Sequence, residues 1–94
     1  MTYRVTHIVD GDTFEVTPKW EWGGTDGNRV RPIGYDTPER FEENYKEATK
    51  KLSNLILGKE VELKGPIKLS YDRLLCKVYF EGRDLTYYFP EYER

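Results

Sequence analysis

Two short acidic stretches contain the residues whose types and spacing could do chemistry. The first is "HIVDGDTFEV", in which Asp10 and Asp12 flank a glycine between two apolar runs. The second is "RPIGYDTPER", in which Asp36 and Glu39 follow an apolar segment. Carboxylates gathered in one place repel one another unless a cation or arginines intervene. Oxygen ligands of this kind suit a hard divalent ion, Ca²⁺ or Mg²⁺.

Two arginines stand close to these acids in the sequence pattern. Arg31 precedes Asp36 by five positions, and Arg73 begins the apolar alternation that ends at Phe80. A guanidinium presents a planar fork that matches phosphate oxygens. Phosphodiester hydrolysis needs positive charge on the phosphate and a carboxylate that takes a proton from water. The two acidic stretches and the arginines therefore predict a metal-dependent phosphodiesterase.

Each acidic stretch also has a purely structural interpretation. Asp10-Gly11 between apolar residues is a strong hairpin signal, because the turn needs positive φ and both residues tolerate it. Thr37 and Pro38 suit the N-cap and first position of a helix, with Glu39 near the positive end of its dipole. These structural roles are compatible with functional ones.

The elements that must position these residues are short strands and one helix. Alternation predicts strands over 2–9, 13–19, 29–35 and 74–80, with a further strand beginning at 61. Apolar residues at helical spacing predict a helix over 41–57, ended by Gly58. Loops are expected over 22–28 and from 64 to 73. The order βββαββ suits a mostly β fold with one main helix, a five-stranded Greek-key barrel of the OB type. Open α+β sheets remain an alternative at this point.

Composition narrows the classes of function. The 94 residues predict one domain, and the net charge of −2 argues against a sequence-independent duplex binder. The single Cys76 cannot form an internal disulfide. The chain shows neither a signal peptide nor an apolar run long enough to span a membrane. We therefore expect a cytoplasmic monomer with no membrane partner.

Three motifs together resemble a known family. "VDGDTF", "VRPIGYDTPE" and "YDRLLCKVYFEG" are similar to the three signatures of the staphylococcal-nuclease-like, or thermonuclease, family. They occur in the family's order, with a helix expected between the second and third, and the resemblance runs from about residue 5 to 86. The family consists of OB-fold nucleases that use Ca²⁺ to hydrolyse DNA and RNA. The resemblance thus implies a calcium-dependent endonuclease acting on single-stranded DNA or RNA.

The resemblance also implies a metal site. By it, Asp12 and Asp36 are direct ligands of Ca²⁺, and the carbonyl of Thr37 is a third. Asp10 is a supporting acid close to the metal.

Catalytic roles follow from the same resemblance. Glu39 orients or deprotonates the attacking water, while Arg31 and Arg73 bind the scissile phosphate. Tyr71 is a candidate nucleotide-binding residue.

The chain departs from the family's pattern in ways that keep a second reading open. The family usually has Tyr-Gly-Arg where this chain has Tyr71-Asp72-Arg73, so a different register would leave the catalytic arginine missing. Residues 1–94 also lack the family's C-terminal helical extension. The alternative is a catalytically inactive OB-fold module that binds nucleic acid or protein.

Overall fold

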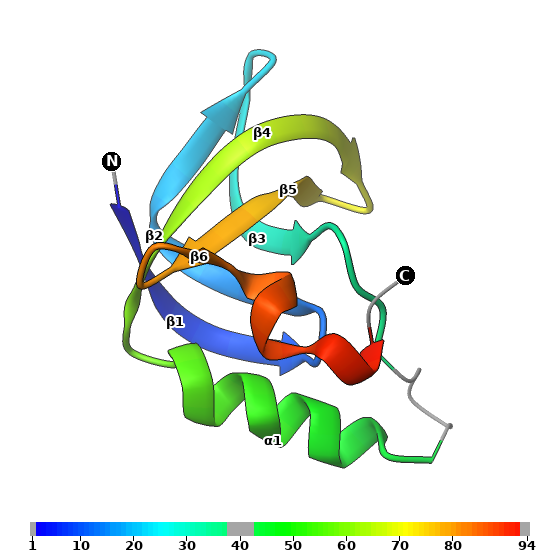
Figure 1. The fold of residues 1–94 in the computed structure, drawn as a ribbon. Helices are drawn as coiled ribbons and strands as arrows, with labels where there is room; N and C mark the ends of the chain where they lie inside the picture. Colours follow the sequence, from blue (N-terminus) through cyan, green and yellow to red (C-terminus); the bar gives the residue numbers. More distant parts are fainter. Residues whose placement is uncertain (1, 38–42, 93–94) are drawn as a thin grey trace.

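Short strands and a single α-helix make up the part of the chain that the structure, a computed structural model, describes, namely residues 2–37 and 43–92. The strands are β1 (Thr2–Asp10), β2 (Thr13–Trp22), β3 (Thr25–Pro32), β4 (Glu60–Ser70), β5 (Arg73–Phe80) and β6 (Arg83–Asp84). The helices are α1 (Tyr45–Ile56) and two 3₁₀ turns, η1 (Leu85–Tyr88) and η2 (Pro90–Tyr92). Figure 1 shows their arrangement.

Five strands close into a barrel. The sheet order is β3-β2-β1-β4-β5-β6, with antiparallel neighbours throughout. β3 and β5 then pair in parallel, which joins the two ends of the five-stranded part. The predicted βββαββ order and OB-like barrel are confirmed. Strand β6 and the two 3₁₀ turns follow β5 as a short C-terminal addition.

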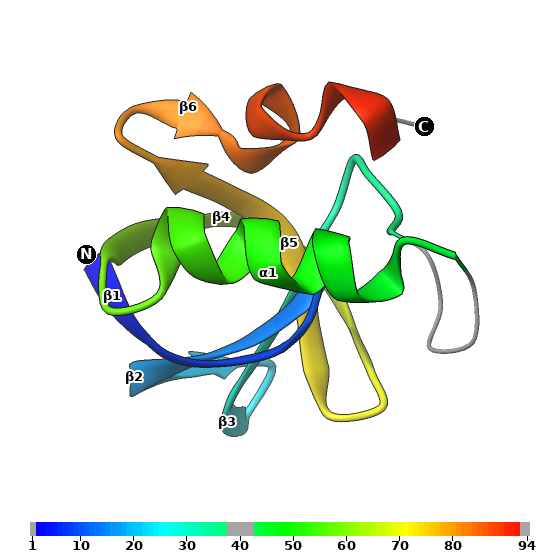
Figure 2. The ribbon, with the colours of Figure 1, turned by 90° about the horizontal axis from the view of Figure 1, so that it is seen from below.

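The core lies inside the barrel and under α1. Residues of β5 alternate between buried and outward positions, and the buried ones are Leu74, Cys76, Val78 and Phe80. The helix buries Ala48, Leu52 and Ile56 and packs along β1. Figures 1 and 2 show that α1 covers one end of the barrel. None of the helices in the described ranges combines the length and apolar character that a membrane crossing requires.

Two segments predicted as loops are strands. β2 continues to Trp22 and β3 starts at Thr25, so the hairpin turn consists of Gly23 and Gly24, both at positive φ. β4 likewise extends to Ser70, with a register shift after Lys64. Strands in polar and glycine-rich stretches are difficult to predict from apolar alternation, because backbone pairing rather than apolar burial stabilises them.

The helix begins later than its sequence pattern suggested. Asn44 is the N-cap, in the left-handed conformation at φ 68, and α1 starts at Tyr45. The prediction that Thr37 caps this helix is therefore wrong, and residues 38–42 lie outside the described residues. The end was predicted correctly, since Gly58 follows the C-cap Leu57 at φ 78.

Candidate active site

The first acidic stretch forms the tight turn between β1 and β2. Asp10 Oδ1 accepts a hydrogen bond from the Asp12 N–H at 3.0 Å, which closes the turn. Gly11 does not have positive φ, contrary to the sequence prediction. Instead, a Cβ at Gly11 would lie 2.8 Å from Thr37 Oγ1 and 2.9 Å from the Ala48 Cβ. Glycine is needed here because Thr37 and α1 approach the turn closely.

Tyr35 fixes the exit of β3 against this turn. Its hydroxyl donates to the Gly11 carbonyl at 3.2 Å, and its fully buried ring stacks on Phe89 with centroids 4.7 Å apart. Burial, followed by the nearby Asp12 carboxylate, raises the pKa of Tyr35 above its usual range, so the hydroxyl remains a donor. The next residue, Asp36, donates its N–H to the Tyr92 carbonyl at 3.0 Å.

Arg31 lies between the two acidic stretches. Its Nη2 atom is 2.8 Å from Asp36 Oδ1 and 3.7 Å from Asp12 Oδ2. The distance between Asp36 Oδ1 and Asp12 Oδ2 therefore cannot exceed the sum of these two distances. The structure thus brings Asp12 and Asp36 together, as the sequence predicted, and places an arginine against both.

Arg73 reaches the same place from β5, the strand that pairs with β3. Its Nη1 donates to Thr13 Oγ1 at 3.1 Å, and its Nε donates to the Ser70 carbonyl at 3.3 Å. The Thr13 hydroxyl lies 3.4 Å from Asp12 Oδ1, to which it donates. Arg73 is therefore linked to Asp12 through one buried hydroxyl.

The site carries an unfavourable charge at Asp12. Burial raises the pKa of this carboxyl to about 6, and Asp10 contributes through a hydrogen bond and its like charge. Arg31 and Arg73 act in the opposite direction and offset only part of the shift. At neutral pH the ionised Asp12 is costly, and a further positive charge beside it would be favourable.

The donor set fits a hard cation in its chemistry. Asp12 and Asp36 offer carboxylate oxygens, the ligands that Ca²⁺ and Mg²⁺ take. Within residues 2–37 and 43–92, however, no three His, Cys, Asp or Glu side chains gather around a point where a metal could sit. Glu39, the predicted catalytic base, lies outside the described residues.

The β4–β5 turn accommodates Asp72 in a conformation that usually favours glycine. Tyr71 and Asp72 are its two central residues, at φ 52 and 65, a combination typical of a type I′ turn. Asp tolerates this conformation and takes the place where the family has glycine. Tyr71 is 89 % exposed beside Arg73. Arg83 lies at the far end of β5, with its guanidinium 4.4 Å from the Tyr87 ring centroid.

Comparison with known proteins identifies a curated protein with a similar sequence. The chain is similar to an uncharacterized endonuclease of Haemophilus influenzae. The two sequences are 33 % identical over 85 residues, which cover 90 % of this chain and 46 % of the Haemophilus protein. The chain thus spans about half the length of the curated relative that it matches. No protein-family model matches the chain.

Two residues of the site were missed by the sequence reasoning. Thr13 joins Arg73 to Asp12, and Tyr35 joins the β3 exit to the first turn. Their positions in the sequence could have indicated both residues, since Thr13 directly follows Asp12 and Tyr35 directly precedes Asp36. The similarity to the Haemophilus protein covers most of the chain, but it assigns no role to either residue.

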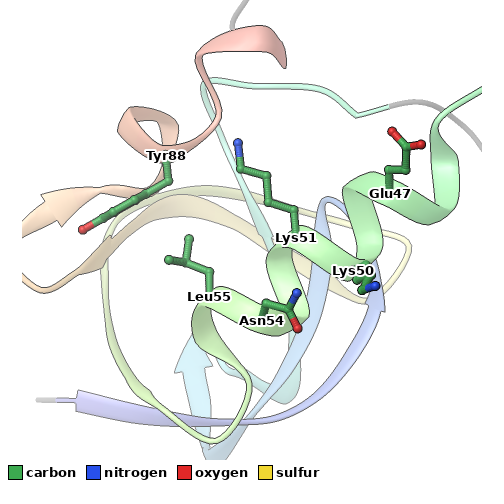
Figure 3. Close-up of a pocket in the computed structure, with 6 residues that line it drawn as sticks. All are labelled: Glu47, Lys50, Lys51, Asn54, Leu55 and Tyr88. Carbon is green, nitrogen blue, oxygen red and sulfur yellow. The ribbon is translucent and has the colours of Figure 1, made fainter.

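A separate hollow lies between α1 and η1 (Figure 3). Its volume is about 470 Å³, and its lining residues are Glu47, Lys50, Lys51, Asn54, Leu55 and Tyr88. None of the predicted site residues that the structure describes lines it. Lys51, which points across the hollow in Figure 3, is bound to Glu91 at 2.8 Å. The chemistry predicted from the sequence therefore belongs to the acid and arginine network and not to this hollow.

Proposed function

We propose that this chain is a calcium-dependent endonuclease of the thermonuclease type that hydrolyses phosphodiester bonds in single-stranded DNA or RNA. The observation that carries the proposal is the single Arg31 nitrogen lying against both Asp12 and Asp36. Asp12 and Asp36 are far apart in the sequence but lie close together in the structure. Two arginines lie beside them, and this combination suits phosphoryl chemistry. Similarity to a Haemophilus influenzae protein named as an endonuclease supports the same activity.

Asp12 and Asp36 would hold the ion, together with the Thr37 carbonyl. Bound there, Ca²⁺ would neutralise a phosphate oxygen and make a nearby water more acidic. The raised pKa of Asp12 supports this assignment, because a cation relieves the repulsion from Asp10.

The arginines act on the phosphate. Arg31 exchanges its carboxylate partners for phosphate oxygens when substrate binds, and Arg73 adds a second guanidinium beside it. Both hold negative charge that grows on the phosphate oxygens in the transition state. Ser70 and Thr13 keep Arg73 aimed at the site through the two hydrogen bonds described above.

Glu39 accepts a proton from the attacking water. The water oxygen then bonds to phosphorus as the bond to the leaving oxygen breaks. A carboxylate in this role contributes about 10²–10⁴ in rate.

One observation favours the alternative of an inactive binding module. Arg31 already lies against both Asp12 and Asp36, so each of these carboxylates has a positively charged partner without a metal. In such a module the barrel would bind nucleic acid or protein without cleaving it.

Cleavage assays decide between these functions. The purified chain is incubated with end-labelled single-stranded DNA and RNA in Ca²⁺, in Mg²⁺ and in EDTA. The nuclease proposal expects shortened products in Ca²⁺ and none in EDTA. Retention of intact nucleic acid without cleavage under every condition would select the binding module.

A further inference from the structure

A row of lysines lies on the outer face of the β4–β5 pair. In β5 the buried residues alternate with outward ones, and Leu75 and Lys77 point outward. Lys68 pairs with Leu75 and Lys64 pairs with Lys77, so these β4 lysines share the outer face. We call Lys64, Lys68 and Lys77 the lysine row. All three are exposed.

The lysine row continues into the site arginines. Two positions before Leu75 on the same face of β5 is Arg73. On the other side of β5, the parallel register pairs Arg29 with Arg73 and Arg31 with Leu75. Figure 1 shows β3, β5 and β4 as neighbouring strands. Cationic side chains therefore run from the proposed active site along the outside of the sheet.

This concentration of positive charge is unusual for the chain. The protein has 17 acidic and 15 basic residues, with a net charge of −2. Lys68 and Lys77 nevertheless form no ion pair with any residue in the described ranges. Lys64 lies 4.0 Å from Glu62, at the limit of an ion pair, and 4.8 Å from the Tyr79 ring centroid. The lysine row is thus available to anions from outside the protein.

The spacing of the lysine row suits a chain of phosphates. A strand rises about 3.3 Å per residue, so outward positions two residues apart are separated by about 6.6 Å. This separation is similar to that between successive phosphates of an extended single strand. Lys68 lies opposite Leu75, one outward position beyond Arg73, and Lys64 and Lys77 face each other at the next position. The row therefore offers a single strand two successive cationic positions beside the site.

We propose that the lysine row binds the backbone phosphates of single-stranded nucleic acid that lie one and two nucleotides beyond the scissile phosphate. This inference rests on the proposed nuclease function, which places the reacting phosphate at Arg31 and Arg73. The row guides the strand along the outer face of β5 and lengthens the stretch of substrate that the enzyme holds. Affinity therefore rises with oligonucleotide length until the row is occupied.

Binding measured in EDTA tests this without cleavage. The triple variant Lys64→Gln, Lys68→Gln, Lys77→Gln is compared with wild type by fluorescence anisotropy. The probes are labelled oligodeoxythymidylates of about 16 nucleotides, the upper end of the range for OB folds, and of about 2 nucleotides, too short to reach from Arg73 to the end of the row. The variant should bind the longer probe at least ~10-fold more weakly and the shorter probe almost as well as wild type. Its log–log salt slope should be smaller by about 2, since each single-strand contact contributes about 0.7.

The matched control removes the same charge elsewhere. Lys46→Gln, Lys50→Gln, Lys59→Gln changes exposed lysines on α1 and in the turn after it, at the end of the barrel that the helix covers (Figure 1). This control should bind the longer probe within about 2-fold of wild type, because diffuse charge alone is largely screened. Thermal melting verifies that both variants are folded.

The outcomes separate the lysine row from the nuclease function. Equal losses in the row variant and the control, or no loss in the row variant, would overturn the lysine row while leaving cleavage by wild type intact. A selective loss in the row variant, with no cleavage by wild type in any divalent ion, would establish the row and refute the nuclease. If wild type neither binds nor cleaves, both proposals are wrong.

Discussion

Arg31 Nη2 lies 2.8 Å from Asp36 Oδ1. The same nitrogen also lies 3.7 Å from Oδ2 of Asp12, which belongs to the turn between the first two strands. One guanidinium therefore joins two acids that the chain delivers from separate elements. The proposed chemistry requires these three side chains to act on one phosphate and one cation.

Arg73 should matter far more than Arg83. Arg73→Ala should lower turnover by about 10²–10³, the usual loss for one transition-state donor. Arg83→Ala is the matched control, because it lies at the other end of β5 and contacts Tyr87. Steady-state cleavage rates measure both. Equal and small effects would mean that Arg73 does not touch the reacting phosphate.

Tyr35→Phe should separate positioning from stability. The substitution removes the hydrogen bond to the Gly11 carbonyl and should cost about 1 kcal/mol of unfolding free energy. Tyr88→Phe removes a hydrogen bond of the same length, 3.2 Å, to the Phe80 carbonyl. Urea unfolding should show similar losses in both.

Only Tyr35→Phe should also slow cleavage, by about 10-fold or more, because a small shift of the first turn displaces Asp12. Cleavage rates that fall equally in both tyrosine variants would show that stability alone explains the loss.

Asp12 should make folding stability depend on pH in a specific direction. Its folded pKa is about 6, above the ordinary value of 3.8. The protonated form is therefore favoured by folding, and its stabilising contribution is complete below about pH 4 and lost as pH rises through about 6. In EDTA, Asp12→Asn should be more stable than wild type at about pH 8 and similar to it at about pH 4.

Urea unfolding at the two pH values measures this difference. Asp26→Asn changes an exposed acid and should show no such pH-dependent gain. A gain for Asp12→Asn that is identical at both pH values would show that the Asp12 carboxyl does not titrate as described.

The fold was largely predictable because its periodicities are simple. Leu74, Cys76, Val78 and Phe80 alternate in the sequence and are buried in the barrel. The parallel β3–β5 pairing that closes the barrel was not predictable from alternation, since alternation carries no information about strand direction. The extension of β4 to Ser70 was missed because Gly65 and Pro66 interrupt the sequence pattern, and because Ile67 and Leu69 beyond them are exposed rather than buried.

The site was predictable as a set of residues but not as a network. Motif order placed Asp12, Arg31 and Asp36 together, and the structure joins them through one nitrogen. The role of Gly11 was misjudged, because its close approach to Thr37 depends on tertiary packing that local turn rules do not contain. Tyr35 was missed for the same reason.

Glu39→Gln should separate catalysis from folding stability. Glutamine keeps the size of the side chain but cannot accept a proton at neutral pH. Because α1 starts only at Tyr45, loss of the Glu39 charge should change stability little, whereas loss of the base should lower the rate by about 10²–10⁴. The variant should melt within a few degrees of wild type and still bind single-stranded DNA in Ca²⁺. Normal hydrolysis by this variant would remove Glu39 from the mechanism.

The central claim is tested most directly by the initial rate of single-stranded DNA cleavage as a function of Ca²⁺ concentration. Wild type should show a saturable rise from no activity in EDTA. Asp36→Asn should need far more Ca²⁺ or lose activity altogether, while Asp26→Asn should follow the wild-type curve. A wild-type rate that does not depend on Ca²⁺, or an Asp36→Asn curve that coincides with wild type, would contradict the account.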